Sequence, residues 1–600
     1  MIMKNTRLFE ISLISAFVFI SSTIISCKSS TSSNAEWEAP DDAHELVNPF
    51  AKNTAALQKG KQLYNLYCQS CHGETGFGDG AARGPLGMRP ANFHDEKIKK
   101  QSNGELFWKL TTGRKDMPSF EQILSEEQRW LLVSYISNIP DKPDLKLPVA
   151  LHPDIKIEHF MAVEPEAVRI LQHHTTGDLW YTTFNGNVFR IKKDSLLVSQ
   201  LVFSVKDHGI EMLQGAAFLN NSIFLCGNVY SADKKSTKGR MVRIDLDSAK
   251  QQPITVVFNT VEYGANKTIY DHGWNAMVIS PDHKYIYVNS GARTDHGEVQ
   301  DNGGLYPKAR DNALTSKIFR FPVDATDLLL PDDEAKLKAD GYLYAKGIRN
   351  AYDLNFDADD NLFAVSNSAD YDYPEDMFWI RQHHHYGFPW VMGGLENPQQ
   401  YKDWKADADS DPFINESSHS WRTNYYYADP EFPARPAGVK FSPGVQNFGP
   451  DANEYRGHSG KIQDGDQTGI AISTFTAHSC PLGLFFDTEK ILSNDFKGDG
   501  FVLRYTLGER SSLMKPFTNE GADLLHLDMV YDEATDNYVT KTTRLVEGFR
   551  EPVDAILVEN IVYVIEYGGR GGNIWKISLP ADTKAINNLK RKLKVSLWGK

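Results

Sequence analysis

The sequence lacks an excess of positive charge. Its 600 residues include 64 Lys and Arg against 78 Asp and Glu, for a formal net charge of −14. Nucleic-acid binding requires a basic surface, and the one basic stretch is "NNLKRKLKVSLWGK" at 587–600. We therefore expect no nucleic-acid partner. The tail suits either a docking contact with a membrane or an acidic partner, or a solvated chain end.

Cysteine is also scarce, with five in the chain. A second C-x-x-C motif is absent, which excludes a ribbon-type zinc site. Cys226 and Cys480 lie outside any motif. An oxidising compartment would permit a disulfide between them, but the sequence does not place them within bonding distance. We expect two buried free thiols.

A long apolar run is found only near the N-terminus, at residues 11–25, where it follows Lys4 and Arg7 and leads into "IISC". With the Ser-rich sequence after Cys27, it resembles a bacterial lipoprotein signal, which implies cleavage before Cys27 and a lipid on that residue. The alternative is an uncleaved membrane anchor, although spanning takes about 20 apolar residues. Both interpretations place the rest of the chain outside the cytoplasm, on the periplasmic or outer surface of a bacterial membrane.

Composition and length indicate a folded chain with several domains. Hydrophobic residues make up 41% of the chain and aromatic residues 12%. A chain of 600 residues exceeds one compact core. The expected division is a signal peptide at 1–27, a Ser-rich and acidic linker at 28–53, an all-α domain at 54–140, a linker at 141–159, an all-β domain at 160–580 and a basic tail at 581–600.

The sequence "YCQSCHG" at 67–73 has the C-x-x-C-H spacing. In this pattern two thiols, here Cys68 and Cys71, attach a c-type haem, and the adjacent histidine, His72, ligates the iron. The histidine argues against a simple thiol redox pair. We predict haem c at this position.

The surrounding sequence resembles a class I c-type cytochrome domain over residues 54–140. In that family Gly60 lies where the first helix packs against the last, and Pro85 lies where a carbonyl orients the haem histidine. The resemblance implies Met117, in "TTGRKDMPSF", as the sixth iron ligand, a pairing that raises the haem potential. His94 is the rival ligand, but we expect it to be structural because "RPANFHDE" shows no helical pattern.

After the second linker, short β-rich runs alternate with turns such as "TTGD" and "SPDH". The runs form six loosely repeated units, which contain "AVRIL", "GAAFL", "AMVIS", "AYDLN", "LGLFF" and "PVDAI". Six units predict a six-bladed β-propeller. The long irregular region at 383–470 leaves a seven-bladed ring open, and a β-sandwich fits the spacing less well.

Several units resemble the quinoprotein sugar dehydrogenases, which use pyrroloquinoline quinone (PQQ) and calcium. The resemblance covers residues 160–580 outside an insertion near 390–470. The stretch "DHGWNAMVISPDHKYIYVNSG" puts His272 at the family's catalytic base, and "KGIRNAYDLNF" puts Arg349 and Asn350 over the quinone. Such a histidine accepts a hydroxyl proton, and such an arginine stabilises negative charge on the acceptor.

The resemblance also implies ligands for the rest of the cofactor. PQQ carries three carboxylates, so further cations are expected; the candidates are Arg510, Lys497 and Arg504. Where the family has a Gly-Pro pair that binds calcium, this chain has "SNSADYDYPEDMFWI", whose acids either ligate calcium or form a solvated turn. The calcium candidates are Asp370, Asp372 and Asp376, with Glu375 beside them.

These features suggest a propeller that oxidises a sugar or other alcohol with PQQ, and a haem domain that passes the electrons to a separate respiratory carrier. Two alternatives stay open. A propeller without quinone would be a binding or docking module for the cytochrome, which the altered acidic segment favours. A lactonase-like hydrolase would hold a metal in the central channel. The insertion is rich in Trp, Tyr and acids, which suits carbohydrate stacking or a structural flap.

Overall fold

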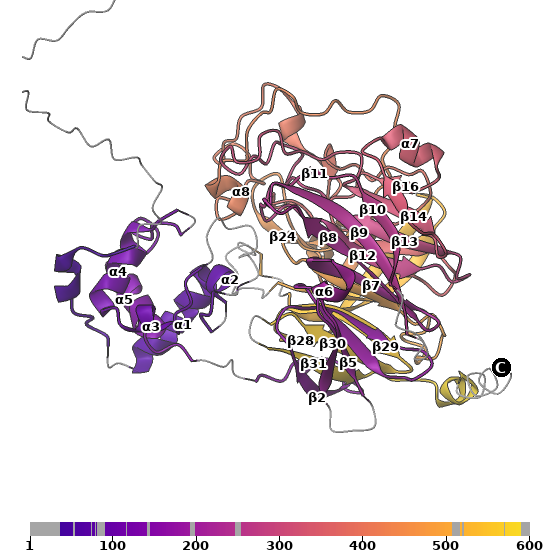
Figure 1. Ribbon diagram of the computed structural model, residues 1–600, viewed down its shortest axis with the longest axis horizontal. Helices are drawn as coiled ribbons and strands as arrows, with labels where there is room; N and C mark the ends of the chain where they lie inside the picture. Colours follow the sequence, from indigo (N-terminus) through magenta and orange to yellow (C-terminus); the bar gives the residue numbers. More distant parts are fainter. Residues whose placement is uncertain are drawn as a thin grey trace, which may run out of the picture.

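The computed structural model describes residues 37–589, apart from 52–53, 74, 79, 81–89, 116, 141–144, 193–197, 247–253, 507–516, 519–520 and 569–570. A small helical domain lies beside a larger β-rich body (Figure 1), and the predicted order of an all-α domain followed by a six-bladed propeller is confirmed. The predicted lipid site Cys27 and the candidate cation Arg510 lie outside the described residues. Within the described part of the chain, none of the helices has the length and apolar character needed to cross a membrane.

The helical domain contains α1 (Thr54–Tyr67), α2 (Gln69–His72), α3 (Glu96–Lys99), α4 (Asn103–Thr112) and α5 (Glu126–Ile136). α4 and α5 begin after Ser102 and Ser125, whose side chains form capping boxes with the first turn of each helix. α1 packs on α5 at Gly60, where an added Cβ atom would lie 2.2 Å from the carbonyl oxygen of Leu131. The expected close approach of the first and last helices is therefore present.

Part of the predicted N-terminal linker packs on the helical domain. The 3-10 helix η1 (Asp41–Glu45) buries Ala43 against α4. An added Cβ on Gly104 of α4 would lie 1.9 Å from the carbonyl oxygen of Ala43, so glycine permits this contact. Asn48 donates a hydrogen bond of 3.0 Å to the hydroxyl of Ser134 in α5. Residues 41–48 of the predicted linker therefore lie against the helical domain.

Six mainly antiparallel sheets follow along the chain, one for each predicted unit. Blades 1 to 3 contain β3 (Ala167–Gln172), β4 (Leu179–Thr183), β5 (Val188–Ile191) and β6 (Ser199–Phe203); β7 (Met212–Leu219), β8 (Ser222–Tyr230), β9 (Ser236–Asp245) and β10 (Ile254–Thr260), with β11 (Tyr263–Gly264) and β15 (Leu328–Leu330) at the edge; and β12 (Trp274–Ile279), β13 (Tyr285–Ser290), β14 (Lys317–Pro322) and β16 (Leu343–Lys346).

Blades 4 to 6 contain β17 (Ala351–Phe356), β18 (Leu362–Ser366) and β19 (Asp376–Trp379); β25 (Pro481–Phe486), β26 (Gly500–Arg504), β27 (Asp523–Asp532) and β28 (Asn537–Glu547), with β1 (Val149–Ala150) and β22 (Gln446–Pro450) paired to β28; and β29 (Pro552–Val558), β30 (Ile561–Glu566), β31 (Gly572–Ser578) and β2 (Lys156–Val163). The short helices α6 (Val205–His208) and α7 (Glu334–Ala339) lie between strands.

The first strands of the six blades form the inner ring. Each packs on the first strand of the next blade, in the order β3, β7, β12, β17, β25, β29 and back to β3. Each also shows a register shift near its start, where it pairs with the second strand of its blade. β2, which precedes the first blade, pairs with β31 of the last blade and so completes the ring. The ring is closed with six blades, which settles the blade number.

The first hairpin of each blade turns through a residue with a positive φ angle. These residues are Gly177, Asn220, His283, Asp360, Lys490 and Glu559. They coincide with the turn signals in the sequence, such as "TTGD" and "SPDH". Because each first strand runs from the ring face where it starts to this turn, the strand starts and the hairpin turns lie at opposite ends of the blades.

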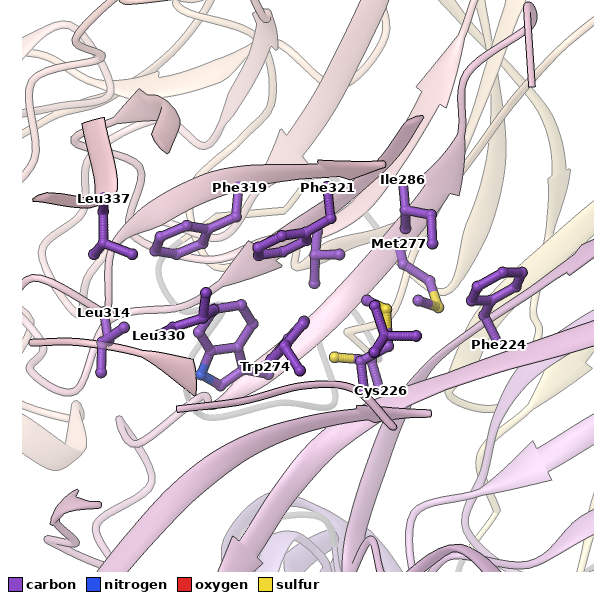
Figure 2. Packing of buried hydrophobic residues seen from close by; sticks show 14 of the residues in the cluster. Phe224, Cys226, Trp274, Met277, Ile286, Leu314, Phe319, Phe321, Leu330 and Leu337 are labelled. Atoms are coloured by element: carbon purple, nitrogen blue, oxygen red, sulfur yellow. The ribbon is translucent and has the colours of Figure 1, made fainter. Parts of the chain in front are cut away.

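Hydrophobic clusters fill the spaces between blades. Figure 2 shows the cluster between blades 2 and 3, where Phe224 and Cys226 of β8 face Trp274 and Met277 of β12. Trp274 and Cys226 are both fully buried. Cys226 and Cys480 are both free thiols in the structure; Cys226 is buried as expected, whereas Cys480 is half-buried.

The insertion forms a separate layer of short elements. It contains β20 (Val391–Met392), β21 (Leu395–Glu396), η3 (Pro398–Gln400), α8 (His419–Arg422), β23 (Glu454–Arg456), β24 (Ile462–Asp464) and α9 (Gly465–Thr468), in addition to β22. Phe413 and Tyr426 from this segment are buried with Ala292 and Tyr371, which belong to loops of blades 3 and 4. The insertion therefore packs as a flap on the face where the first strands start.

Candidate functional site

The C-x-x-C-H loop lies at the end of α1. Cys68 is buried as the residue before α2, and Cys71 and His72 occupy the last positions of α2. The Nδ1 atom of His72 lies 3.0 Å from the carbonyl oxygen of Ala91. The ring stacks on Phe93 with 4.6 Å between centroids. These two contacts fix the orientation of the histidine.

This geometry fits a haem ligand. A carbonyl accepts from Nδ1–H, so Nε2 keeps the lone pair that would bind iron. Burial lowers the pKa of His72, and only the neutral imidazole ligates a metal. Pro85, expected to supply the orienting carbonyl, lies outside the described residues. Ala91 fills that role in the structure. Cys68 and Cys71 would hold the porphyrin, and His72 the iron.

The two candidates for the sixth ligand differ in their surroundings. His94 places Nε2 2.7 Å from the carbonyl oxygen of Thr75 and stacks on Phe77, with 3.9 Å between ring centroids. This supports a structural role for His94. Met117 is half-buried against the core of the helical domain, and its backbone pairs with Arg114 in a tight turn. Met117 stays the predicted ligand.

The three residues predicted around the quinone meet on the ring face where the first strands start. An added Cβ on Gly291 would lie 2.6 Å from Cβ of His272 and 2.9 Å from Oδ1 of Asn350. The backbone N–H of Ala292 donates a hydrogen bond of 2.6 Å to the carbonyl oxygen of Arg349. The loops before β12, after β13 and before β17 thus bring His272, Arg349 and Asn350 together.

His272 is suited to accept a proton. Its Nδ1 lies 2.9 Å from the carbonyl oxygen of Ala292, which leaves the Nε2 lone pair as the basic position. Burial, and secondarily the charge of Arg349, lower the pKa of His272 to about 3. The histidine is therefore neutral at physiological pH, and its Nε2 lone pair can accept a proton or a hydrogen bond.

Arg349 is held by backbone and carboxylate oxygens. Its Nε donates to the carbonyl oxygen of Asp295 at 3.0 Å, and one terminal nitrogen contacts Oδ1 of Asp295 at 2.8 Å. The other terminal nitrogen donates to the carbonyl oxygen of Asn367 at 3.2 Å. Asn350 accepts a hydrogen bond of 2.8 Å from the amide of Asn275, which in turn accepts one of 2.8 Å from Asn289. Buried amides thus fix the orientation of Asn350 beside His272 and Arg349.

The structure does not gather the three calcium candidates at one point. Asp370 accepts from the hydroxyl of Tyr270 at 2.6 Å, and Asp372 contacts His478 at 2.7 Å. Asp376 accepts from the backbone N–H of Gly393 at 3.0 Å. Among the described residues, no group of three or more His, Cys, Asp or Glu side chains is arranged to hold a metal ion. A calcium site stays a prediction without support from these contacts.

Two of the candidate cations for the PQQ carboxylates, Lys497 and Arg504, are among the described residues. Lys497 is exposed in the hairpin turn between β25 and β26, at the opposite end of the blades. Arg504 is fully buried and donates a hydrogen bond of 2.9 Å to Asp523. The residues present therefore fit the reacting part of a quinone, while the candidate for its carboxylates, Arg510, is not among the described residues.

Sequence reasoning missed two buried residues near this site, Asp295 and Ser420, and named Glu375 only as a neighbour of the calcium candidates. Ser420 and Asp295 share a hydrogen bond and join the insertion to Arg349. Burial raises the pKa of Glu375 to about 7, although His478 opposes the shift. The sequence held one signal: "RTDHGE" after β13 places four ionisable residues in a region that is otherwise rich in turn residues.

The fold and the haem loop define a c-type cytochrome domain joined to a six-bladed β-propeller. Residues 55–136 match the family model described as cytochrome c oxidase, cbb3-type, subunit III. A search of curated proteins gave no match.

Solved structures of three dehydrogenases are similar to most of this chain. A glucose dehydrogenase is 11% identical, with a TM-score of 0.44 over 71% of this chain and 100% of its own. The soluble aldose sugar dehydrogenase from Escherichia coli, in the apo form, is 13% identical, with a TM-score of 0.43 over 71% and 99%. The PQQ domain of pyranose dehydrogenase from Coprinopsis cinerea is 13% identical, with a TM-score of 0.43 over 73% and 99%.

Proposed function

We propose that this chain is a quinohaemoprotein dehydrogenase that oxidises a hydroxyl group of a sugar or other polyol and passes the electrons to its own haem. The observation that carries the proposal is the neutral His272, with Nε2 as its basic position, beside Arg349 and Asn350. PQQ, when bound, accepts the two electrons of the alcohol and releases them singly.

The residues of the site have separate tasks. His272 accepts the hydroxyl proton at Nε2 as the C–H bond of the same carbon is broken. Arg349 directs N–H donors to the place where negative charge develops, and Asn350 supplies an amide in a fixed orientation. Cys68, Cys71 and His72 hold the haem that receives the electrons.

The location of the protein forms part of the same proposal. Cleavage before Cys27 and a lipid on that residue would anchor the chain to a bacterial membrane, on the periplasmic or outer side. A respiratory carrier would then take the electrons from the haem.

The test is haem reduction in the full chain with haem attached, after addition of PQQ and a panel of sugars and alcohols, with and without calcium. We expect one substrate class to reduce the haem only when PQQ is present. The His272→Ala variant should lose about 10²- to 10⁴-fold in rate, the usual contribution of a general base. The matched control is His283→Asn, at an exposed histidine in the β12–β13 turn. If no substrate reduces the haem and PQQ does not bind, the propeller is a docking module.

A docking module is the second candidate, and one observation favours it. The three nitrogens of Arg349 already contact Asp295 and Asn367. Such an arginine has fewer donors left for a ligand than one with an open guanidinium. PQQ binding measured by itself separates the two candidates.

A further inference from the structure

Asp295 is the partner of Arg349 and is fully buried. It follows β13 in the loop of blade 3, and its Oδ1 lies 2.8 Å from the guanidinium. Its Oδ2 lies 2.9 Å from Nε2 of His296, which is also fully buried. Burial opposes a charge on His296, but Asp295 and Glu298 raise the pKa of His296 to about 9. Asp295 thus lies between two cations, and both hold it ionised.

Ser420 connects this pair to the insertion. It lies in α8, is fully buried, and donates its hydroxyl to Oδ2 of Asp295. Its hydroxyl also lies 2.9 Å from that of Tyr270, and its backbone N–H donates to Asp370 at 2.9 Å. Tyr270 and Asp370 flank Arg349: the guanidinium lies 5.8 Å from the Tyr270 ring, and the Asp370 N–H donates to Asp295 at 3.2 Å.

We propose that Asp295 and Ser420 are positioning residues for Arg349, so that the 391–470 insertion sets the orientation of the arginine at the site. The proposal deepens the proposed function and rests on it for its effect on the reaction. It names a role for the insertion that differs from carbohydrate stacking. The contact is direct at each step: α8 to Asp295 through the Ser420 hydroxyl, and Asp295 to Arg349 through a carboxylate oxygen.

The physical argument concerns the freedom of a long side chain. Arg349 contacts Asp295 twice, through Nε at the backbone carbonyl oxygen and through a terminal nitrogen at the carboxylate, and the two contacts together define the plane of the guanidinium. Asp295 can define that plane only if its own rotamer is fixed. Ser420 and His296 contact one carboxylate oxygen, and Arg349 the other. Removal of the Ser420 hydroxyl takes one hydrogen bond away from the buried carboxylate of Asp295.

The first experiment needs no cofactor in the propeller. The full chain with haem attached is treated with phenylglyoxal, and modification of Arg349 is followed by peptide mass spectrometry. In the unchanged protein Arg349 is 6% exposed, so we expect slow modification. Asp295→Asn and Ser420→Ala should each raise the rate of Arg349 modification by roughly tenfold or more. Loss of one hydrogen bond to a charged group changes an equilibrium by about that factor.

A double variant shows whether the two residues act together. If Ser420 acts through Asp295, Arg349 should be modified no faster in the Asp295→Asn, Ser420→Ala double variant than in Asp295→Asn alone. The matched control is Ser417→Ala, at an exposed serine ahead of α8. Unchanged thermal unfolding of Ser420→Ala would show that the fold is retained. The proposal would be overturned if Arg349 were modified at the same rate in all variants. It would also be overturned if the effects of the two single substitutions added in the double variant.

The second experiment uses the loaded protein. For Ser420→Ala we expect kcat to fall while KM stays within twofold, because Arg349 acts on charge that develops in the reaction and not on substrate binding. A rise of KM alone would contradict this. If the protein oxidises no substrate at all, the proposed function fails, yet the modification rates still decide whether the insertion holds Arg349.

Discussion

At the scale of single residues, Met117 is the predicted sixth ligand of the haem iron and is therefore expected to set the haem potential. It is half-buried against the helical core, and its thioether is the predicted sixth ligand. Leucine has a similar volume, so Met117→Leu should keep the fold. We expect the reduction potential to fall by on the order of 100 mV, because the axial ligand is a main determinant of that potential. Redox titration followed by absorbance measures it.

The control for this variant is Met529→Leu, at a half-buried position of β27 in the propeller. Its potential should equal that of the unchanged protein. An unchanged potential in Met117→Leu would mean that another group completes the iron coordination.

Asp376 predicts a dependence of stability on pH. Burial raises the pKa of Asp376 from 3.8 to about 6, although Ser473 and Gly393 donate hydrogen bonds to it. Between pH 3.8 and 6 the folded state therefore keeps a proton that the unfolded state has lost, and stability falls as pH rises through this window. An asparagine does not titrate. Relative to that of the unchanged protein, the free energy of unfolding of Asp376→Asn should rise by up to about 3 kcal/mol from pH 4 to pH 7.5.

Denaturant unfolding at the two pH values measures this difference. The control, Asp409→Asn, replaces an exposed carboxyl of the insertion and should show no change with pH. A difference between Asp376→Asn and the unchanged protein that stays constant with pH would show that folding does not shift the pKa of this carboxyl.

Sequence reasoning reached the residues whose neighbours along the chain carry the signal. His272, Arg349 and Asn350 each follow a local motif, and the structure brings the three together. Ser420 was missed because its partner Asp295 is 125 residues away, and no local pattern marks a buried serine. The grouping of Asp370, Asp372 and Asp376 was inferred from nearness in sequence. In the structure their side chains have different partners.

At the scale of elements, the contact of α1 with α5 depends on one missing side chain. A Cβ atom on Gly60 would lie 2.2 Å from the Leu131 carbonyl oxygen and 2.8 Å from Cβ of Tyr135. Gly60→Ala should therefore push the two helices apart and destabilise the cytochrome domain by about 2 kcal/mol or more. Calorimetry should show a lower transition for this domain and an unchanged one for the propeller.

The matched control is Gly264→Ala in β11, where an added Cβ meets no atom within 4 Å. If Gly60→Ala and Gly264→Ala lowered stability equally, α1 and α5 would lie further apart than the structure shows.

The elements of the propeller were predictable to the extent that they are local. Each first hairpin was visible, because its two strands and its turn are adjacent in sequence. The pairing of β1 and β22 with β28 was not visible, since these strands come from distant parts of the chain. The packing of η1 on α4 was not visible either, because η1 carries little hydrophobic periodicity.

At the scale of the whole molecule, the two domains divide the proposed reaction. A Cys68→Ala, Cys71→Ala variant would lack the covalent haem while the propeller site is unchanged. We expect it to oxidise the substrate with a soluble dye as acceptor, at a rate within about twofold of the unchanged protein. Transfer to a protein acceptor should be lost. Parallel assays with the two acceptors measure both.

The result that contradicts this division is a loss of dye reduction together with the haem. Such a loss would mean that substrate oxidation itself requires the cytochrome domain. Unchanged unfolding of the propeller in the variant is the necessary control.

The strand that closes the ring also fixes an order of events during synthesis. His159 of β2 contacts Asn573 of β31, 414 residues further along the chain. Contacts between such distant residues form late, since the intervening chain must be made and brought together. The helical domain, with Cys68, Cys71, Ala91 and α5, is synthesised before β31, the strand that pairs with β2. The cytochrome domain is therefore complete, and open to haem attachment, while the propeller is still an unclosed arc.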